Sequence, residues 1–131
     1  MITYSDTRAI DAKALSAVFE RSGIKRPYAD LDRLQKMIDH ADIVIGAWDG
    51  DRLVGVARAI TDYSYCCYLS DLAVDEQYQR QCIGRQLVER LQEKLGEQVS
   101  LLLISAPGAV DYYPKLGFEK SDRAYLIPRS Q

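Results

Sequence analysis

Residues Leu72 to Leu91 read LAVDEQYQRQCIGRQLVERL, and this stretch decides the fold of the chain. A short apolar strand runs into a polar turn, and the turn leads directly into an amphipathic helix. The turn spans Gln79 to Arg85, where slim residues let a ligand approach the main chain closely. Unpaired N–H groups and the positive end of the helix dipole favour an anion there, and the dipole alone contributes roughly 0.3–2 kcal/mol. The turn therefore predicts a binding site for a phosphorylated cofactor.

The bulk composition is that of one soluble globular domain covering residues 1–131. Hydrophobic residues make up 47% and charged residues 27%, which is ordinary for such a domain. The net charge is -2 and no basic block stands out, which argues against a nucleic acid partner.

The cysteines and the apolar segments bound the compartment. Three cysteines, two of them adjacent (Cys66 and Cys67), do not make a disulfide framework, so a reducing cytoplasm is expected. One histidine and no CxxC pair argue against a structural zinc site, and no metal is expected. The first residues lack the basic and apolar regions of a signal peptide, and no apolar run approaches the ~20 residues that span a bilayer, so no membrane partner is expected.

The hydrophobic periodicity predicts alternating strands and helices. A strand at 2–4 precedes a helix with Ser5, Asp6 or Thr7 as its cap and Gly23 as its stop, and a second helix starts at Asp30. Strands at 43–48, 53–60 and 66–74 form an antiparallel meander, with Asp49-Gly50 at the first hairpin. The remaining predictions are a helix from 83 that stops at Gly96, a strand at 99–104 covered on both faces, a short helix at 107–116 and a last strand at 124–127. The strand before the helix from 83 and the strand after it should be parallel.

Two segments carry a family resemblance. Leu72-Ala73-Val74 is followed by Gln79-x-x-Cys82-x-Gly84, and Ala109 to Phe118 reads AVDYYPKLGF. Together with the element order, they resemble the GNAT superfamily of acetyl-CoA-dependent N-acetyltransferases. The resemblance implies an α/β (α+β mixed) domain with a mostly antiparallel central sheet and flanking helices. In that sheet the parallel strands at about 69–74 and 99–104 splay apart, and acetyl-CoA enters the gap.

The resemblance also implies roles for individual residues. Cofactor binding falls to the strand end and the turn, mainly through main-chain groups: Leu72, Ala73, Val74, Gln79, Arg80, Gln81, Cys82, Ile83, Gly84 and Arg85. Tyr113 aligns with the tyrosine that protonates the departing thiolate, in preference to Tyr112. Cys82 stands where the family has glycine, so we expect weaker cofactor affinity, with a redox switch as the alternative. Ala106 replaces a family asparagine.

The acceptor side rests on three residues. By strand alternation Asp71 shares a face with Leu69 and Ala73, where its carboxylate either accepts the amine proton or forms a salt bridge. Arg26 and Tyr28 lie between the first two helices, where the resemblance places the acceptor pocket, and a solvated loop is the alternative.

The function that follows is transfer of acetyl from acetyl-CoA to a primary amine, by direct attack in a ternary complex. A small-molecule amine is favoured over a protein N-terminus, and a homodimer is compatible with the resemblance. The alternative is a non-catalytic acyl-CoA-binding or sensor domain. A nucleotide-dependent oxidoreductase is not supported, because the chain has neither GxGxxG after its first strand nor GxxxxGK(S/T).

Overall fold

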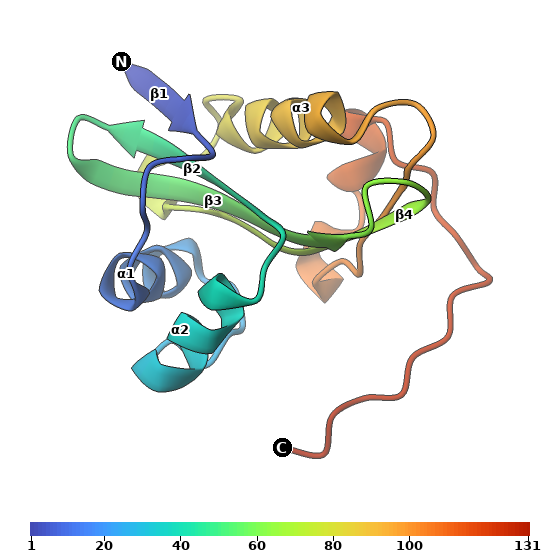
Figure 1. The fold of residues 1–131 in the computed structure, drawn as a ribbon, viewed down its shortest axis with the longest axis horizontal. Coiled ribbons are helices and arrows are strands. Elements are labelled where there is room, and N and C mark those ends of the chain that lie inside the picture. Colours follow the sequence, from blue (N-terminus) through green and yellow to red (C-terminus); the bar gives the residue numbers. More distant parts are fainter.

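The computed structural model describes residues 1–131 as a mixed sheet between two layers of helices (Figure 1). The elements in chain order are β1 (Ile2–Ser5), α1 (Ala12–Ser22), α2 (Leu31–Asp39), β2 (Ile43–Asp49), β3 (Arg52–Thr61), β4 (Cys66–Val74), η1 (Glu76–Tyr78), α3 (Ile83–Leu95), β5 (Ser100–Leu102), η2 (Pro107–Ala109) and η3 (Tyr113–Leu116). The five strands lie in the order β1-β2-β3-β4-β5. The first four are antiparallel, and β4 and β5 are parallel, so the predicted meander and parallel pair are confirmed.

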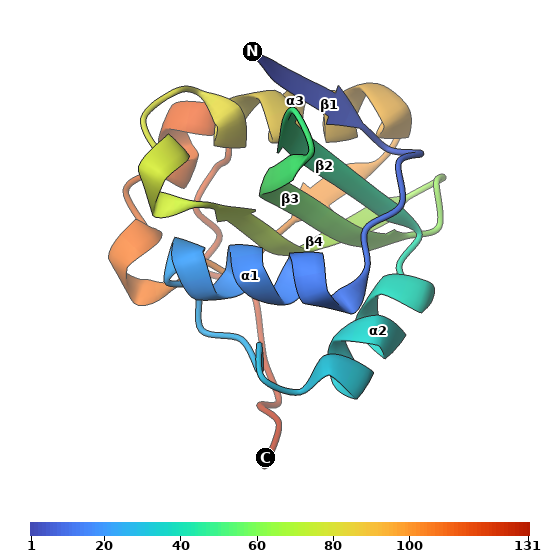
Figure 2. The same ribbon diagram turned by 90° about the vertical axis from the view of Figure 1, so that its left-hand side faces the viewer.

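Each face of the sheet has its own apolar core. Helices α1 and α2 cover one face and α3 covers the other (Figure 2). On the α3 side, Leu87 and Leu91 belong to one apolar cluster with Ile45 and Leu69. On the other side, Phe19 of α1 belongs to a second cluster with Leu34 of α2 and Val56 of β3. Burial of such a side chain contributes about 1.5–3 kcal/mol. The two cores fix the sheet between the helices. The edge of the sheet opposite β1 is formed by β5 and, where β5 does not pair, by β4.

A bulge at Ser70 changes which way β4 presents its side chains. Along β3 and β4 the pairing passes from Arg58 opposite Asp71 to Ala59 opposite Leu69, so Ser70 has no partner. An extra residue reverses the alternation of a strand. Leu69 accordingly packs on the α3 side and Ala73 on the α1 and α2 side. Asp71 therefore shares a face with Ala73 but not with Leu69, and that part of the prediction is wrong.

Strands β4 and β5 separate after a short paired stretch. They pair from Cys66 opposite Ser100 to Tyr68 opposite Leu102, and β4 then continues to Val74 without β5 beside it. The N–H of Asp75 bonds to the carbonyl of Val54 on β3 at 2.8 Å. Because successive residues of a strand point their main-chain groups to opposite edges, Leu72 and Val74 direct theirs to the free edge. The predicted splay is confirmed, and it leaves main-chain groups available at the open end.

Other local expectations were wrong. Helix α1 begins at Ala12, and its cap is Asp11, whose carboxylate accepts from the N–H of Ala14 at 2.8 Å. Ser5 instead accepts from the N–H groups of the turn that follows β1. The strand expected at 99–104 has three residues and is not covered on both faces, since Leu102 is 49% exposed.

The C-terminal part holds less regular structure than its sequence predicts. Residues 107–116 form two short 3-10 turns instead of a helix. Residues 124–127 form no strand, and their side chains are exposed, with Tyr125 at 98% and Ile127 at 95%. The tail extends away from the domain (Figure 1). An isolated segment of β-prone residues has no strand structure unless a neighbouring strand accepts its hydrogen bonds.

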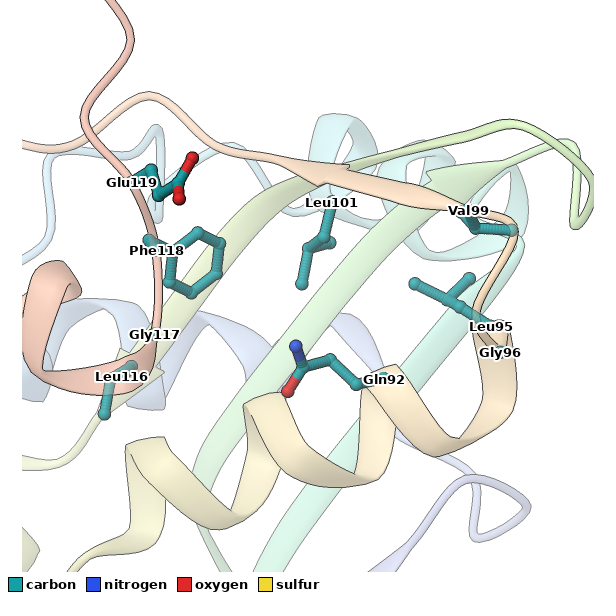
Figure 3. Close-up of a pocket in the computed structure, with 9 residues that line it drawn as sticks. All are labelled: Gln92, Leu95, Gly96, Val99, Leu101, Leu116, Gly117, Phe118 and Glu119. Carbon is teal, nitrogen blue, oxygen red and sulfur yellow. The ribbon is translucent and has the colours of Figure 1, made fainter.

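The helices, the metal-ligating side chains and the cavities limit where a site can lie. None of the helices combines the length and the apolar character that a bilayer span demands. His, Cys, Asp and Glu side chains do not gather in any group of three or more that could hold a metal, and all three cysteines are free. A cavity of about 390 Å³ lies between the C-terminal half of α3, β5 and residues 116–119 (Figure 3).

Candidate active site

The N-terminus of α3 has no side-chain cap. Helices α1 and α2 begin with Asp11 and Asp30, and each carboxylate accepts a main-chain N–H of the first turn. Helix α3 begins after Cys82, and no side chain bonds to its first turn. The first N–H groups of a helix have no partner within it. The start of α3 is therefore an open site for an anion, as the sequence predicts.

Two residues of the turn before α3 adopt a left-handed backbone. Arg80 has φ 67° and Cys82 has φ 62°, and neither is glycine. A side chain in this region costs roughly 1–2 kcal/mol. The structure thus explains why glycine is expected at position 82: the backbone there turns in a way that only glycine adopts without strain. The Cys82 side chain is exposed and lines the cavity described next.

A cavity of about 490 Å³ joins this turn to the free edge of β4. Its lining contains Leu72 and Val74 of β4, Arg80 and Arg85 beside the start of α3, and Lys115 of η3. No acidic residue lines it, although the chain as a whole carries a net charge of -2. An apolar strand edge beside three cationic side chains and an uncapped helix fits a ligand with an extended arm and phosphate groups.

Gly84 lets Tyr112 pack against the first turn of α3. A Cβ atom at Gly84 would lie 2.4 Å from the Tyr112 hydroxyl oxygen, a distance that real Cβ atoms do not show. Tyr112 also lines the cavity. Gly84 is therefore required here by a side chain, in addition to any ligand that approaches the turn.

Tyr113 is held between two aromatic rings. Its ring packs edge-on against Phe118 at 5.7 Å and against Tyr112 at 5.3 Å between centroids. Burial raises the pKa of Tyr113 above 10, the neighbouring Tyr112 raises it further, and the positive charge of Arg26 opposes both effects. The phenol is therefore protonated at neutral pH, as a proton donor must be. Burial also raises the pKa of Tyr112.

The remaining predicted cofactor residues divide into two groups. Ile83, Gln79 and Gly84 line the cavity together with the residues named above, and Gln79 donates from Nε2 to the carbonyl of Val74 at 3.0 Å. That hydrogen bond ties the turn to the end of β4. Ala73 is buried on the opposite face of the sheet, and Gln81 is not part of the lining.

Asp71 lies between two arginines. Its Oδ1 accepts from Arg26 Nε at 2.5 Å, and its Oδ2 accepts from Arg58 Nε. The carboxylate is completely buried, and the salt bridge that we considered as an alternative is present. Each carboxylate oxygen therefore already has a charged hydrogen-bond donor.

The loop between α1 and α2 is tied to β4 through Arg26. Besides Asp71, Arg26 donates from Nη2 to the carbonyl of Ser70 at 2.7 Å. Tyr28 accepts at its main-chain carbonyl from the Ser16 hydroxyl at 2.6 Å, and its ring is partly exposed. Arg26 thus has a structural role whether or not it contacts an acceptor.

Sequence reasoning missed two residues of this site, Arg58 and Lys115, and the contact of Tyr112 with Gly84. Arg58 lies opposite Asp71 in the β3–β4 register, so a correct register would have found it. Arg85 donates from Nη2 to the carbonyl of Lys115 at 2.9 Å, which joins α3 to η3, and nothing in the sequence signals that pair.

A mixed sheet that opens between two parallel strands, beside a basic helix start and a half-buried tyrosine, is the arrangement expected of an α/β acyltransferase. The chain belongs to the GNAT acetyltransferase family, because residues 10–126 match the family model for the acetyltransferase (GNAT) domain.

Individual proteins agree with this assignment. The chain is 33% identical over 107 residues to GCN5-related N-acetyltransferase 2, chloroplastic, of Arabidopsis thaliana, covering 75% of this chain and 41% of the relative. It is 32% identical over 115 residues to serotonin N-acetyltransferase 2, chloroplastic, of Oryza sativa subsp. japonica, covering 83% of this chain and 56% of the relative. The chain thus spans about half the length of these relatives.

Among solved structures, a GNAT family acetyltransferase from Streptococcus pneumoniae has a TM-score of 0.76 and 25% identity, with 98% of this chain and 99% of that chain covered. A probable acetyltransferase from meticillin-resistant Staphylococcus aureus has a TM-score of 0.84 and 23% identity, with 98% and 100% covered, and supports the fold.

Proposed function

We propose that this chain transfers the acetyl group of acetyl-CoA to a primary amine of a small molecule, by direct attack in a ternary complex. The observation that carries the proposal is the basic cavity that runs from the uncapped start of α3 to the free edge of β4. The names of the relatives support N-acetyl transfer, and the rice relative is named for serotonin, a small amine.

The parts of the cavity suit the parts of acetyl-CoA. The main-chain N–H groups at the start of α3, with Arg80 and Arg85, suit the pyrophosphate. The main-chain groups of Leu72 and the N–H of Val74, which point to the free edge of β4, suit the pantetheine amides in the way that an added strand pairs with a sheet edge, while the Val74 carbonyl already accepts from Gln79. Acetyl-CoA supplies an activated acetyl group as a thioester. The protein then has to place that thioester beside an amine and a proton donor.

Tyr113 is the proton donor in this proposal. The amine nitrogen forms a bond to the acetyl carbon, and the carbon–sulfur bond breaks. The departing thiolate takes the phenol proton of Tyr113, which regains a proton from water. The raised pKa of Tyr113 keeps the phenol protonated until the thiolate forms. Proton donation of this kind contributes typically about 10²–10⁴-fold to a rate.

Asp71 has a positioning role in this proposal. Both of its oxygens accept from guanidinium groups, so the proton of the amine passes to water rather than to this carboxylate. Asp71 instead holds Arg26 and Arg58 on either side of β4 at the bulge, which fixes the strand edge beside the thioester.

Two measurements test the proposal. Titration calorimetry with acetyl-CoA should show saturable binding, and a thiol-detecting assay should show release of CoA with a panel of primary amines that includes serotonin and amino acids. The matched control is Arg129→Gln in the exposed tail, compared with Arg85→Gln in the cavity. Arg85→Gln should weaken acetyl-CoA binding and Arg129→Gln should not. Absence of any heat with acetyl-CoA would refute the proposal, and saturable binding without CoA release from any amine would refute its catalytic part.

A further inference from the structure

The two arginines at the β4 bulge carry more charge than their partner neutralises. Arg26 and Arg58 both form their salt bridges with Asp71, and neither has a second carboxylate within salt-bridge distance. Asp71 is 0% exposed and Arg58 is 7% exposed. A buried group of two guanidinium ions and one carboxylate keeps one uncompensated positive charge, which burial makes more effective than the same charge in water.

That charge is presented to solvent at Arg26. The side chain of Arg26 is 28% exposed, against 9% for Arg58. Its guanidinium is fixed by hydrogen bonds to Asp71, to the carbonyl of Ser70 and, from Nη1, to the carbonyl of Lys25 at 2.8 Å. Each Nη atom of an arginine carries two N–H bonds. Each Nη atom of Arg26 therefore keeps one N–H for a further acceptor, and a carboxylate is the charged acceptor that a guanidinium prefers.

Arg26 also lies beside the part of β4 that β5 leaves unpaired. It bonds to Ser70 and Asp71, next to the point where β4 leaves β5. The positive charge of Arg26 also partly offsets the rise in the pKa of Tyr113, the proposed proton donor, that burial causes. The guanidinium thus lies at the unpaired part of β4, with Asp71 and Ala73 on the opposite face of the sheet from Leu72 and Val74.

We propose that the acceptor is an amine that also carries a carboxylate group, such as an amino acid, and that Arg26 binds the carboxylate. This inference rests on the proposed function and narrows its substrate class. Arg26 is then a specificity residue for the acceptor, and polycationic amines are disfavoured by the same charge. A charged hydrogen bond of this kind is expected to change kcat/KM by on the order of 10- to 100-fold.

The test compares amines that differ in the carboxylate alone. Amino acids are assayed beside their C-terminal amides, tryptophan beside tryptamine, and spermidine as a polycation, by release of CoA from acetyl-CoA. At pH 7.5 a larger fraction of the amides than of the acids carries a neutral amine, which is the nucleophilic form. A preference for the acids would therefore run against intrinsic reactivity. We expect the acids to exceed the amides by about 10- to 100-fold in kcat/KM, mainly through KM.

Variants assign the preference to Arg26. Arg26→Gln should reduce the acid-to-amide ratio toward one by raising KM for the acids, and Arg26→Lys should restore part of it because the charge is kept. Arg33→Gln, at an exposed arginine of α2, is the matched control and should keep the ratio. Retained calorimetric binding of acetyl-CoA shows that each variant is folded.

The outcomes distinguish a wrong carboxylate assignment from a wrong proposed function. Amides, tryptamine or spermidine that react as well as the acids, or a ratio unaffected by Arg26→Gln, would overturn the carboxylate assignment while leaving acetyl transfer in place. Failure of the wild-type protein to bind acetyl-CoA would overturn the proposed function, and this inference with it.

Discussion

Replacing Gly84 with alanine tests the close packing at the start of α3. The new Cβ would lie 2.4 Å from the Tyr112 hydroxyl oxygen, and ordinary contact begins at about 3.4 Å, so the hydroxyl has to move by about 1 Å. The ring of Tyr112 packs edge-on against Tyr113, which limits that movement. Overpacking of this kind costs typically 1–3 kcal/mol.

Helix propensity acts in the opposite direction. Alanine is favoured over glycine within a helix by about 0.8–1 kcal/mol. We therefore expect Gly84→Ala to lower the free energy of unfolding by about 1 kcal/mol, or roughly 4 °C in Tm for a chain of this size. In the Tyr112→Phe background the nearest atom would be the ring carbon Cζ at 3.5 Å, which is an ordinary contact. There, Gly84→Ala should be neutral or stabilising by up to about 1 kcal/mol.

Chemical unfolding of the four proteins in this double-mutant cycle measures the coupling between the two positions. The expected coupling is about 1–3 kcal/mol. Gly108→Ala supplies a matched control near Tyr112 in sequence, because its new Cβ would meet nothing within 4 Å. A coupling below about 0.5 kcal/mol between positions 84 and 112 would mean that the hydroxyl moves freely, and the reasoning would be wrong.

Three more predictions follow from the site. Tyr113→Phe should lower kcat by about 10²–10⁴-fold with little change in the Kd for acetyl-CoA. Because burial raises the pKa of Tyr113, the wild-type phenol does not lose its proton near neutral pH, and a kcat that declined as the pH rose from about 7 to about 9 would contradict the role. Cys82→Gly removes left-handed strain worth about 1–2 kcal/mol against a glycine entropy cost of about 0.5–1 kcal/mol, so thermal unfolding should show a gain of up to about 1.5 kcal/mol. Calorimetry should show tighter acetyl-CoA binding, and unchanged or weaker binding would count against crowding by the thiol. Asp71→Asn leaves two guanidinium ions without a counter-charge and should lower the free energy of unfolding in urea by about 3 kcal/mol. The control Asp51→Asn, at an exposed salt bridge with Arg8, should leave that free energy unchanged. Equal losses in both variants would refute the claim that the buried Asp71 pairs stabilise the fold.

The parts of the fold that the sequence predicted are those with local causes. Asp49-Gly50 forms the predicted hairpin turn because Gly50 adopts φ 61°, and Gly23 ends α1 at φ 78°. Asp30 caps α2, as its place before an apolar stripe indicates. In each case the conformation depends on a residue and its immediate neighbours, which a single sequence contains.

The wrong predictions concern structure that depends on distant partners. The segment 124–127 has the composition of a strand, yet nothing lies beside it to accept its hydrogen bonds. The helix α1 started later than predicted because Ser5 bonds within its own turn, and only Asp11 is followed by a regular apolar stripe. Local propensity could not distinguish between these caps.

The candidate site also has some parts with local causes and others that depend on distant partners. The turn before α3 is predicted from its own residues and Tyr113 from the family resemblance, and the structure places both at one cavity. The partners of Asp71 do not, because Arg26 lies 45 positions and Arg58 lies 13 positions from it. Arg58 becomes its neighbour only through the register of β3 against β4, which the bulge sets.

That bulge determines on which face of the sheet the negative charge lies. If Ser70 were instead paired in a regular ladder, the alternation that places Leu69 on the α3 face would carry Asp71 to that face as well, and would turn Leu72 and Val74 away from it. A carboxylate would then point toward a cavity lined by Arg80, Arg85 and Lys115 and would compete with phosphate for their charge. With the bulge, Leu72 and Val74 of β4 line the basic cavity, and Asp71 is paired with arginines on the opposite face. One unpaired residue therefore separates the side of β4 that suits an anionic cofactor from the side that would meet the acceptor.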